Sequence, residues 1–133
     1  MSNLLDTSVI VRYLINDEPL LADRAREIID RVPDLFVPGV VLAETAFVLF
    51  SVYRISRVVI VDQLVELLRK RNIRALGIEK TLAIQALALC RPSGRVSFAD
   101  ALTWAHARAS GFEAVYTFDA RFPAEGVQLR SHV

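Results

Sequence analysis

Short apolar runs alternate along the whole chain with longer segments of helical periodicity. The short runs are residues 3–5, 35–37, 73–78 and 114–118, with 127–129 as a fifth candidate. Their length is typical of β-strands, and turn residues or helical patterns bound them. The sequence therefore predicts four to five short strands separated by helices.

The longer segments repeat apolar residues at spacings of three and four, which predicts helices. These helices are expected over 8–16, 20–31, 40–53, 56–71, 81–90 and 97–111. Ser56 and Ser97 are typical helix caps, Pro19 suits a first helical position, and Gly111 suits a helix end. Segment 40–53 is apolar all round apart from Glu44, so we expect it to be buried.

Alternating strands and helices predict an α/β fold with three layers, in which helices cover both faces of a central parallel sheet. Parallel neighbours need a crossover, and the helices supply it. The chain has 133 residues without repeats or low-complexity linkers, which indicates one domain over 1–133. Such folds place functional side chains beyond the carboxyl ends of the strands.

Composition narrows the class of protein. The single Cys90 excludes an internal disulfide or a cysteine-based zinc site and suits a reducing compartment. The first six residues do not resemble a signal peptide, and the longest uncharged run, 81–90, is too short to cross a membrane. We therefore expect a cytoplasmic protein. A net charge of +1 means that any nucleic-acid function must come from a local site.

Four acidic residues stand where this fold would use them. Asp6 and Asp119 directly follow the first and fourth strand candidates, Asp100 lies in the first turn of the helix after Ser97, and Glu44 lies in the helix after the second strand candidate. Each is close to a carboxyl-end loop. The sequence therefore predicts that they converge at one edge of the sheet.

Ordinary structural roles are the alternative for three of these acids. Asp6 could cap a helix, Asp100 could complete a capping box with Ser97, and Asp119 could be a turn residue. Glu44 differs, because an unpaired carboxylate in a buried helix would cost several kcal/mol. We therefore expect Glu44 to face a cation or a strong hydrogen-bond donor.

Converging carboxylates would repel one another unless a cation lay among them. An all-oxygen set without a cluster of His or Cys suits Mg²⁺ or Mn²⁺ rather than zinc or copper. Such an ion activates a water and stabilises charge on a phosphate. Phosphodiester cleavage is the chemistry that this pattern favours.

Polar neighbours extend the predicted site. Three hydroxyl side chains flank the first and last acids and could orient them, although local caps are the alternative: Thr7, Ser8 and Thr117. Three arginines near the last two acids are candidate phosphate contacts: Arg91, Arg95 and Arg121.

The four acids lie in the stretches Leu5-Asp6-Thr7-Ser8-Val9, Leu42-Ala43-Glu44-Thr45, Phe98-Ala99-Asp100-Ala101 and Thr117-Phe118-Asp119-Ala120-Arg121-Phe122. In this order they resemble the PIN-domain ribonucleases, and the length resembles the VapC toxins of toxin–antitoxin pairs. The resemblance covers essentially the whole chain. It implies a PIN-like α/β/α domain, a homodimer, and a small antitoxin whose peptide blocks the acidic pocket.

The same resemblance implies a Mg²⁺- or Mn²⁺-dependent endoribonuclease that inhibits translation by cutting RNA. It assigns metal binding and water positioning to four residues: Asp6, Glu44, Asp100 and Asp119. Ser8 and Thr117 match supporting polar positions of the family.

A PIN-like module that binds RNA or a protein without cutting is the alternative from another class. The four acids weigh against it, because a carboxylate cluster repels phosphate. A serine hydrolase lacks support because the chain has no Gly-x-Ser-x-Gly. The five glycines are too scattered to build a phosphate-binding loop.

Overall fold

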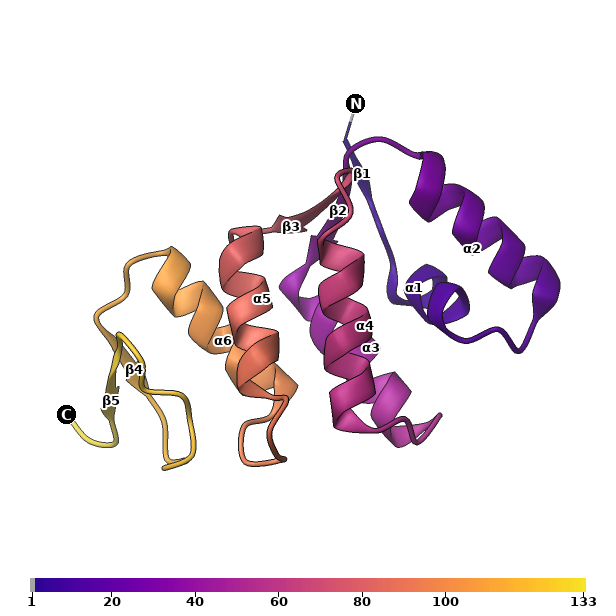
Figure 1. Ribbon diagram of the computed structural model, residues 1–133. Coiled ribbons are helices and arrows are strands. Elements are labelled where there is room, and N and C mark those ends of the chain that lie inside the picture. Colours follow the sequence, from indigo (N-terminus) through magenta and orange to yellow (C-terminus); the bar gives the residue numbers. More distant parts are fainter. Residues whose placement is uncertain (1) are drawn as a thin grey trace.

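The computed structural model describes residues 2–133, and Met1 lies outside the described residues. Strands and helices alternate as predicted, which confirms the α/β class (Figure 1). The elements in chain order are β1 (Asn3–Leu4), α1 (Thr7–Leu14), α2 (Pro19–Arg31), β2 (Leu35–Pro38), α3 (Gly39–Ser51), α4 (Arg57–Leu68), β3 (Ile73–Leu76), α5 (Lys80–Leu89), α6 (Phe98–Ala109), β4 (Ala114–Tyr116) and β5 (Gln128–Arg130). Within residues 2–133, no helix combines the length and the apolar character that a bilayer crossing requires.

The five strands are parallel but form two separate sheets. One sheet has the order β1-β2-β3, with Leu4 opposite Phe36 and Phe36 opposite Arg74. The other contains β4 and β5, with Val115 opposite Leu129. The predicted strands are therefore present, whereas the expected single central sheet is divided into a group of three and a group of two.

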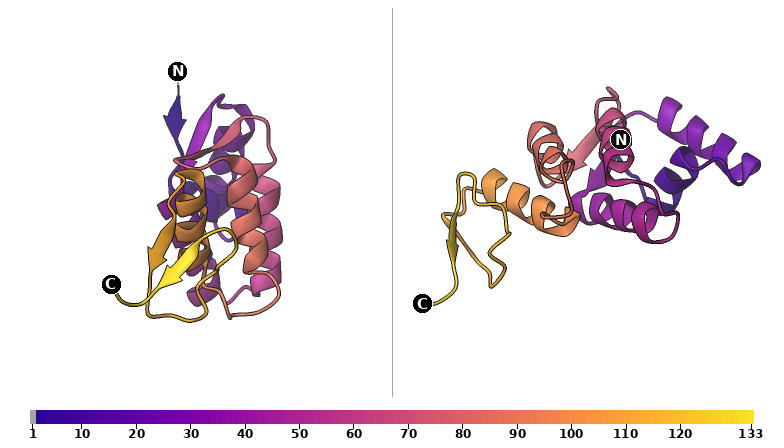
Figure 2. Two further views of the ribbon diagram at one scale, coloured as in Figure 1. Left: turned by 90° about the vertical axis from the view of Figure 1, so that its left-hand side faces the viewer. Right: turned by 60° about the horizontal axis from the view of Figure 1, so that its bottom comes forward.

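Helix α6 explains this division. Its buried side chains Ala101, Leu102 and Ala105 pack in the core, where α6 contacts α5 and α3. Trp104, buried in the same core, donates a hydrogen bond from Nε1 to the carbonyl of Glu125, at 2.8 Å, which holds the segment between β4 and β5 against the helix. Figures 1 and 2 show the result: β4 and β5 lie beyond α6, on the side of β3, whereas β1 is the far edge of the larger sheet.

Helix boundaries follow the predicted capping residues. Ser56 and Ser97 accept hydrogen bonds from the backbones of α4 and α6, and Gly111 has a φ of 70° after α6. A positive φ of this kind is accessible to glycine without strain.

The expectation that segment 40–53 is buried all round is wrong. Helix α3 packs against α1, α4 and α6, which covers only part of its circumference. Val40, Phe47 and Phe50 are 71%, 66% and 51% exposed, and Glu44 is exposed with them. The apolar composition of α3 therefore provides both a core face and an uncovered apolar face.

Truncation of a buried leucine should destabilise the protein much more than truncation of an exposed leucine. Leu64 on α4 is fully buried, whereas Leu20 on α2 is 80% exposed. We expect Leu64→Ala to lower the free energy of unfolding by about 2–5 kcal/mol, because it leaves a cavity. We expect Leu20→Ala to change it by less than about 0.5 kcal/mol. Urea denaturation of both variants measures the difference, and equal effects would contradict the described core.

Candidate functional site

Asp6 follows β1 and caps α1. Its Oδ2 accepts hydrogen bonds from the backbone N–H of Ser8, at 3.1 Å, and from the Ser8 hydroxyl, at 2.7 Å. These bonds, the hydroxyl first, lower the pKa of the Asp6 carboxyl below its ordinary value. The carboxylate is therefore ionised and fixed in direction by the neighbour that the sequence predicts as its support.

Glu44 lies in the second turn of α3 and is exposed to solvent. The expectation that it is a buried carboxylate in need of a cation is therefore wrong, because solvent hydrates it. Its neighbour Thr45 is fully buried. Among the described residues, the hydroxyls of Thr45 and Thr7 are buried without a hydrogen-bond partner. The Thr7 hydroxyl therefore does not orient the Asp6 carboxylate here; Thr7 contributes only through its backbone, whose hydrogen bond helps to lower the pKa of Asp6.

Asp100 is half-buried in the first turn of α6. Its backbone N–H donates to Ser97 Oγ at 3.0 Å, as the predicted cap requires. The positive end of the helix dipole favours an anionic side chain at this position. The backbone N–H of Asp100 thus takes part in the helix cap. The carboxylate is not used in that hydrogen bond and is available for chemistry.

Asp119 lies in the turn after β4. Its Oδ1 accepts hydrogen bonds from Arg121 N, at 2.8 Å, and from Arg121 Nε, at 3.3 Å. Its own N–H donates to Thr117 Oγ1 at 3.0 Å. The backbone bond from Arg121 is the largest cause that lowers the pKa of Asp119, and the charges of Arg121 and Arg95 lower it further. Asp119 is therefore ionised among cations.

The structure does not bring these four acids into one group. Asp6 caps α1, Glu44 lies on α3 and Asp100 on α6, and α3 packs against both α1 and α6, whereas Asp119 follows β4 in the separate β4–β5 unit. Within residues 2–133, no three side chains of His, Cys, Asp or Glu are close enough to hold a metal ion. Carboxylate oxygens suit Mg²⁺ chemically. In this arrangement, however, the acids do not form a site for the ion.

Two of the three candidate phosphate-binding arginines are bound to carboxylates. Arg91 makes a two-pronged ion pair with Asp62 of α4, at 2.9 and 3.0 Å, and Arg121 contacts Asp119. Arg95 is exposed and influences Asp119 through its charge. Arg95 therefore remains the arginine most open to an added phosphate.

Arg57 anchors the loop before α6, a role that the sequence pattern did not predict. Its Nη1 donates to the carbonyls of Val96, at 3.1 Å, and Cys90, at 3.4 Å, and its guanidinium lies 4.9 Å from the ring centre of Phe98. Arg57 thus holds the loop that leads into α6. The sequence does contain an indication of this role, because Arg57 is the first residue of α4 and the helix dipole disfavours a cation there. A partner outside the helix could therefore have been expected.

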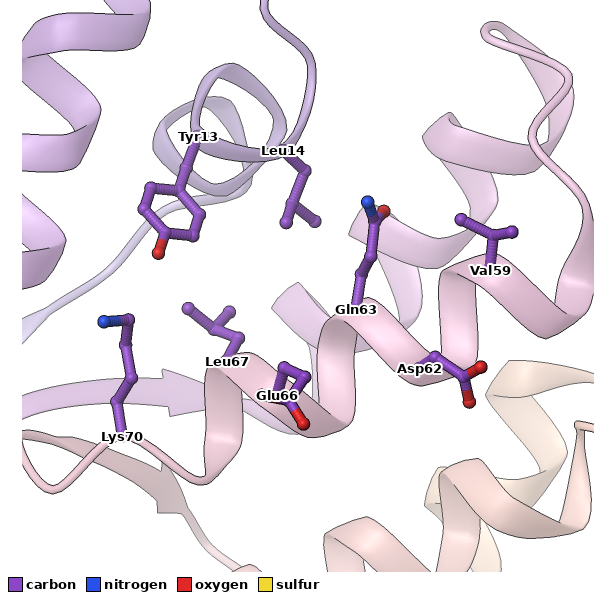
Figure 3. A pocket seen from close by; sticks show the side chains of 8 residues that line it. All are labelled: Tyr13, Leu14, Val59, Asp62, Gln63, Glu66, Leu67 and Lys70. Carbon is purple, nitrogen blue, oxygen red and sulfur yellow. The ribbon is translucent and has the colours of Figure 1, made fainter.

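A hollow of about 460 Å³ lies between α1 and α4, away from the predicted acids (Figure 3). Its walls are Tyr13, Leu14, Val59, Asp62, Gln63, Glu66, Leu67 and Lys70. Asp62 is engaged with Arg91, and Lys70 with Asp30. The charged groups on its rim therefore already have partners within the chain.

The family model of the PIN domain matches residues 4–125, a range that contains all four acids. The chain therefore belongs to the PIN domain family, which confirms the resemblance at that level. PIN domains are generally nucleases, commonly metal-dependent, and they act on nucleic acids. The match thus supports a nuclease, a hydrolase in broad terms. A search of curated proteins found no match to this chain.

The hydroxyl of Ser8 should control the acidity of Asp6. We expect Ser8→Ala to raise the pKa of Asp6, because the largest cause of its lowering is removed. A carboxyl whose pKa is lower in the folded than in the unfolded protein stabilises the fold at pH values above the unfolded-state pKa. This stabilisation is lost as the pH falls through the folded-state pKa. The variant should therefore lose less stability on acidification. NMR titration of the Asp6 carboxyl measures the shift, with Ser131→Ala as the remote control, and an unchanged pKa would contradict the hydrogen bond.

Proposed function

We propose that this PIN-domain protein is an endoribonuclease that hydrolyses RNA phosphodiester bonds. The observation that carries the proposal is the family match over residues 4–125, with an acid at each of the four motif positions within it. In this proposal the catalytic and metal-binding residues are Asp6, Glu44, Asp100 and Asp119. Their oxygen-only chemistry supports Mg²⁺ or Mn²⁺ as the cofactor. Binding of that ion requires the acids to be brought closer together than they are here.

The local contacts of the acids support their proposed roles. Ser8 directs the carboxylate of Asp6, and Thr117 holds the turn that presents Asp119. Ser8 and Thr117 are therefore proposed as supporting polar residues, and Arg95 as a contact for a substrate phosphate. The Thr7 hydroxyl is buried and has no hydrogen-bond partner among the described residues, so the side chain of Thr7 has no such support.

We further propose a cytoplasmic VapC-type toxin that inhibits translation by cutting RNA, forms a homodimer and is held by a small antitoxin. The resemblance of the chain and its length support this finer assignment. The uncovered face of α3, with Val40, Phe47 and Phe50, supports a protein partner, because exposed apolar patches commonly mark interaction surfaces.

Cleavage of total cellular RNA by the purified protein tests the ribonuclease. We expect discrete fragments with Mg²⁺ or Mn²⁺, none with a chelator, and none from the double variant Asp6→Asn, Asp100→Asn in either metal. End mapping of the fragments then identifies the target. If protein free of any antitoxin shows no metal-dependent difference from the double variant, the non-catalytic binding module becomes the better assignment.

Glu44 separates a catalytic role from a structural one. Because Glu44 is exposed, Glu44→Gln should change the free energy of unfolding of the metal-free protein by less than about 0.5 kcal/mol. We expect its cleavage rate to fall by about 10²-fold or more, because the substitution removes a reacting charge. Glu79→Gln, also at an exposed glutamate, is the control that should retain activity. Full activity in Glu44→Gln would remove this residue from the site.

A further inference from the structure

Phe118 presents its aromatic ring to solvent directly before Asp119. It is 95% exposed, which makes it the most exposed phenylalanine among the described residues. It lies in the segment between β4 and β5 (Figure 1), four residues before Phe122, which is buried in the core. An isolated exposed ring is ordinary on a protein surface, so its surroundings decide whether it can bind a ligand.

Hydrogen bonds hold the backbone on both sides of this ring. The N–H of Thr117 donates to the carbonyl of Arg130 at 2.9 Å, and the N–H of Asp119 donates to Thr117 Oγ1 at 3.0 Å. Beyond the ring, Asp119 Oδ1 accepts from the N–H of Arg121 at 2.8 Å. The turn that carries Phe118 is therefore fixed before a ligand arrives, which lowers the entropic cost of binding on the ring.

Two arginines lie around Asp119, the residue that follows the ring. Arg121 contacts Asp119 through Nε at 3.3 Å, and its side chain is 65% exposed, so the guanidinium remains accessible to a ligand. Arg95 is exposed in the loop before α6, and its charge acts on Asp119. A guanidinium matches two phosphate oxygens at once. An exposed aromatic surface and groups that bind phosphate thus occur together.

This combination suits single-stranded RNA. Proteins that bind single strands pair cationic side chains for the backbone with aromatic rings on which bases stack. An unpaired base offers an open face to such a ring, whereas the bases of a duplex are already stacked. A protein partner is the other ligand that an exposed ring suits, but burial of the two neighbouring guanidinium groups without an anion would be costly.

We propose that Phe118 stacks on an unpaired base of the RNA substrate while Arg95 and Arg121 bind phosphates beside that base. This inference rests on the proposed function and deepens it, because it names single-stranded segments and loops as the substrate class. Stacking tolerates every base, so Phe118 selects unpaired over paired RNA rather than a particular sequence. The contact also places the RNA backbone next to Asp119.

Binding of a short single-stranded RNA that contains 2-aminopurine tests the stacking separately from cleavage. A chelator keeps the RNA intact, and stacking of the fluorescent base on a ring quenches its emission. We expect Phe118→Ala to weaken binding about 5- to 100-fold and to lose the quenching, because one base–aromatic stack is removed. Phe118→Tyr keeps a ring and should bind and quench as the wild type does. Thermal melting of both variants should match the wild type, because the ring is exposed.

Three controls separate stacking from other effects. Phe112→Ala is the matched variant, because Phe112 is 63% exposed in the connection between α6 and β4, and it should bind as the wild type does. Phe118→Leu keeps an apolar side chain without a ring and should bind as weakly as Phe118→Ala. A duplex of the same sequence should not distinguish Phe118→Ala from the wild type, because its bases are paired.

The contrary outcomes are equally definite. Unchanged binding in Phe118→Ala, or no binding of single strands by the wild type, would overturn the proposal and favour a protein partner for this ring. Full binding by Phe118→Leu would show an apolar contact instead of stacking. An equal loss in Phe112→Ala would show that the effect is not specific to this turn.

Cleavage kinetics distinguish this inference from the function on which it rests. In an active enzyme, Phe118→Ala should raise KM with little change in kcat, because the stack is lost equally from the bound substrate and the transition state. If the wild type binds through Phe118 but does not cut RNA, the proposed function fails and the stacking contact stands. If the wild type cuts RNA and Phe118→Ala changes neither binding nor KM, the proposed function stands and the stacking contact fails.

Discussion

The packing of α6 against α5 and α3 governs the arrangement of this protein. Small side chains on both α5 and α6 are fully buried there, Ala83 and Ala86 on one helix and Ala101 and Ala105 on the other, so the two backbones can approach closely. Because Trp104 and Arg108 of α6 both donate to the carbonyl of Glu125, the β4–β5 unit follows wherever α6 is placed. One helix contact thus determines the position of two strands and of Asp119.

Local hydrogen bonds prepare the acids even though the fold separates them. Ser8 directs Asp6, Ser97 caps the turn that carries Asp100, and Thr117 and Arg121 hold Asp119. Each bond joins residues close in sequence, so it forms wherever the larger parts of the chain lie. The acidic side chains therefore have defined local geometry, and their relative placement depends on how the β4–β5 unit is positioned.

The sequence by itself determined the α/β class, the order of the elements, the caps at Ser56 and Ser97, and the membership of the PIN family that the match to residues 4–125 confirms. These features depend on periodicity, on capping and on motif residues, all of which act over a few positions. Only the tertiary structure decided that Glu44 is exposed, that Arg57 holds the loop before α6, and that five strands divide into two sheets. An apolar helix such as α3 does not record which of its faces will be covered, and a strand does not record which other strand will lie beside it. Those outcomes depend on contacts between residues far apart in sequence, which local patterns do not specify.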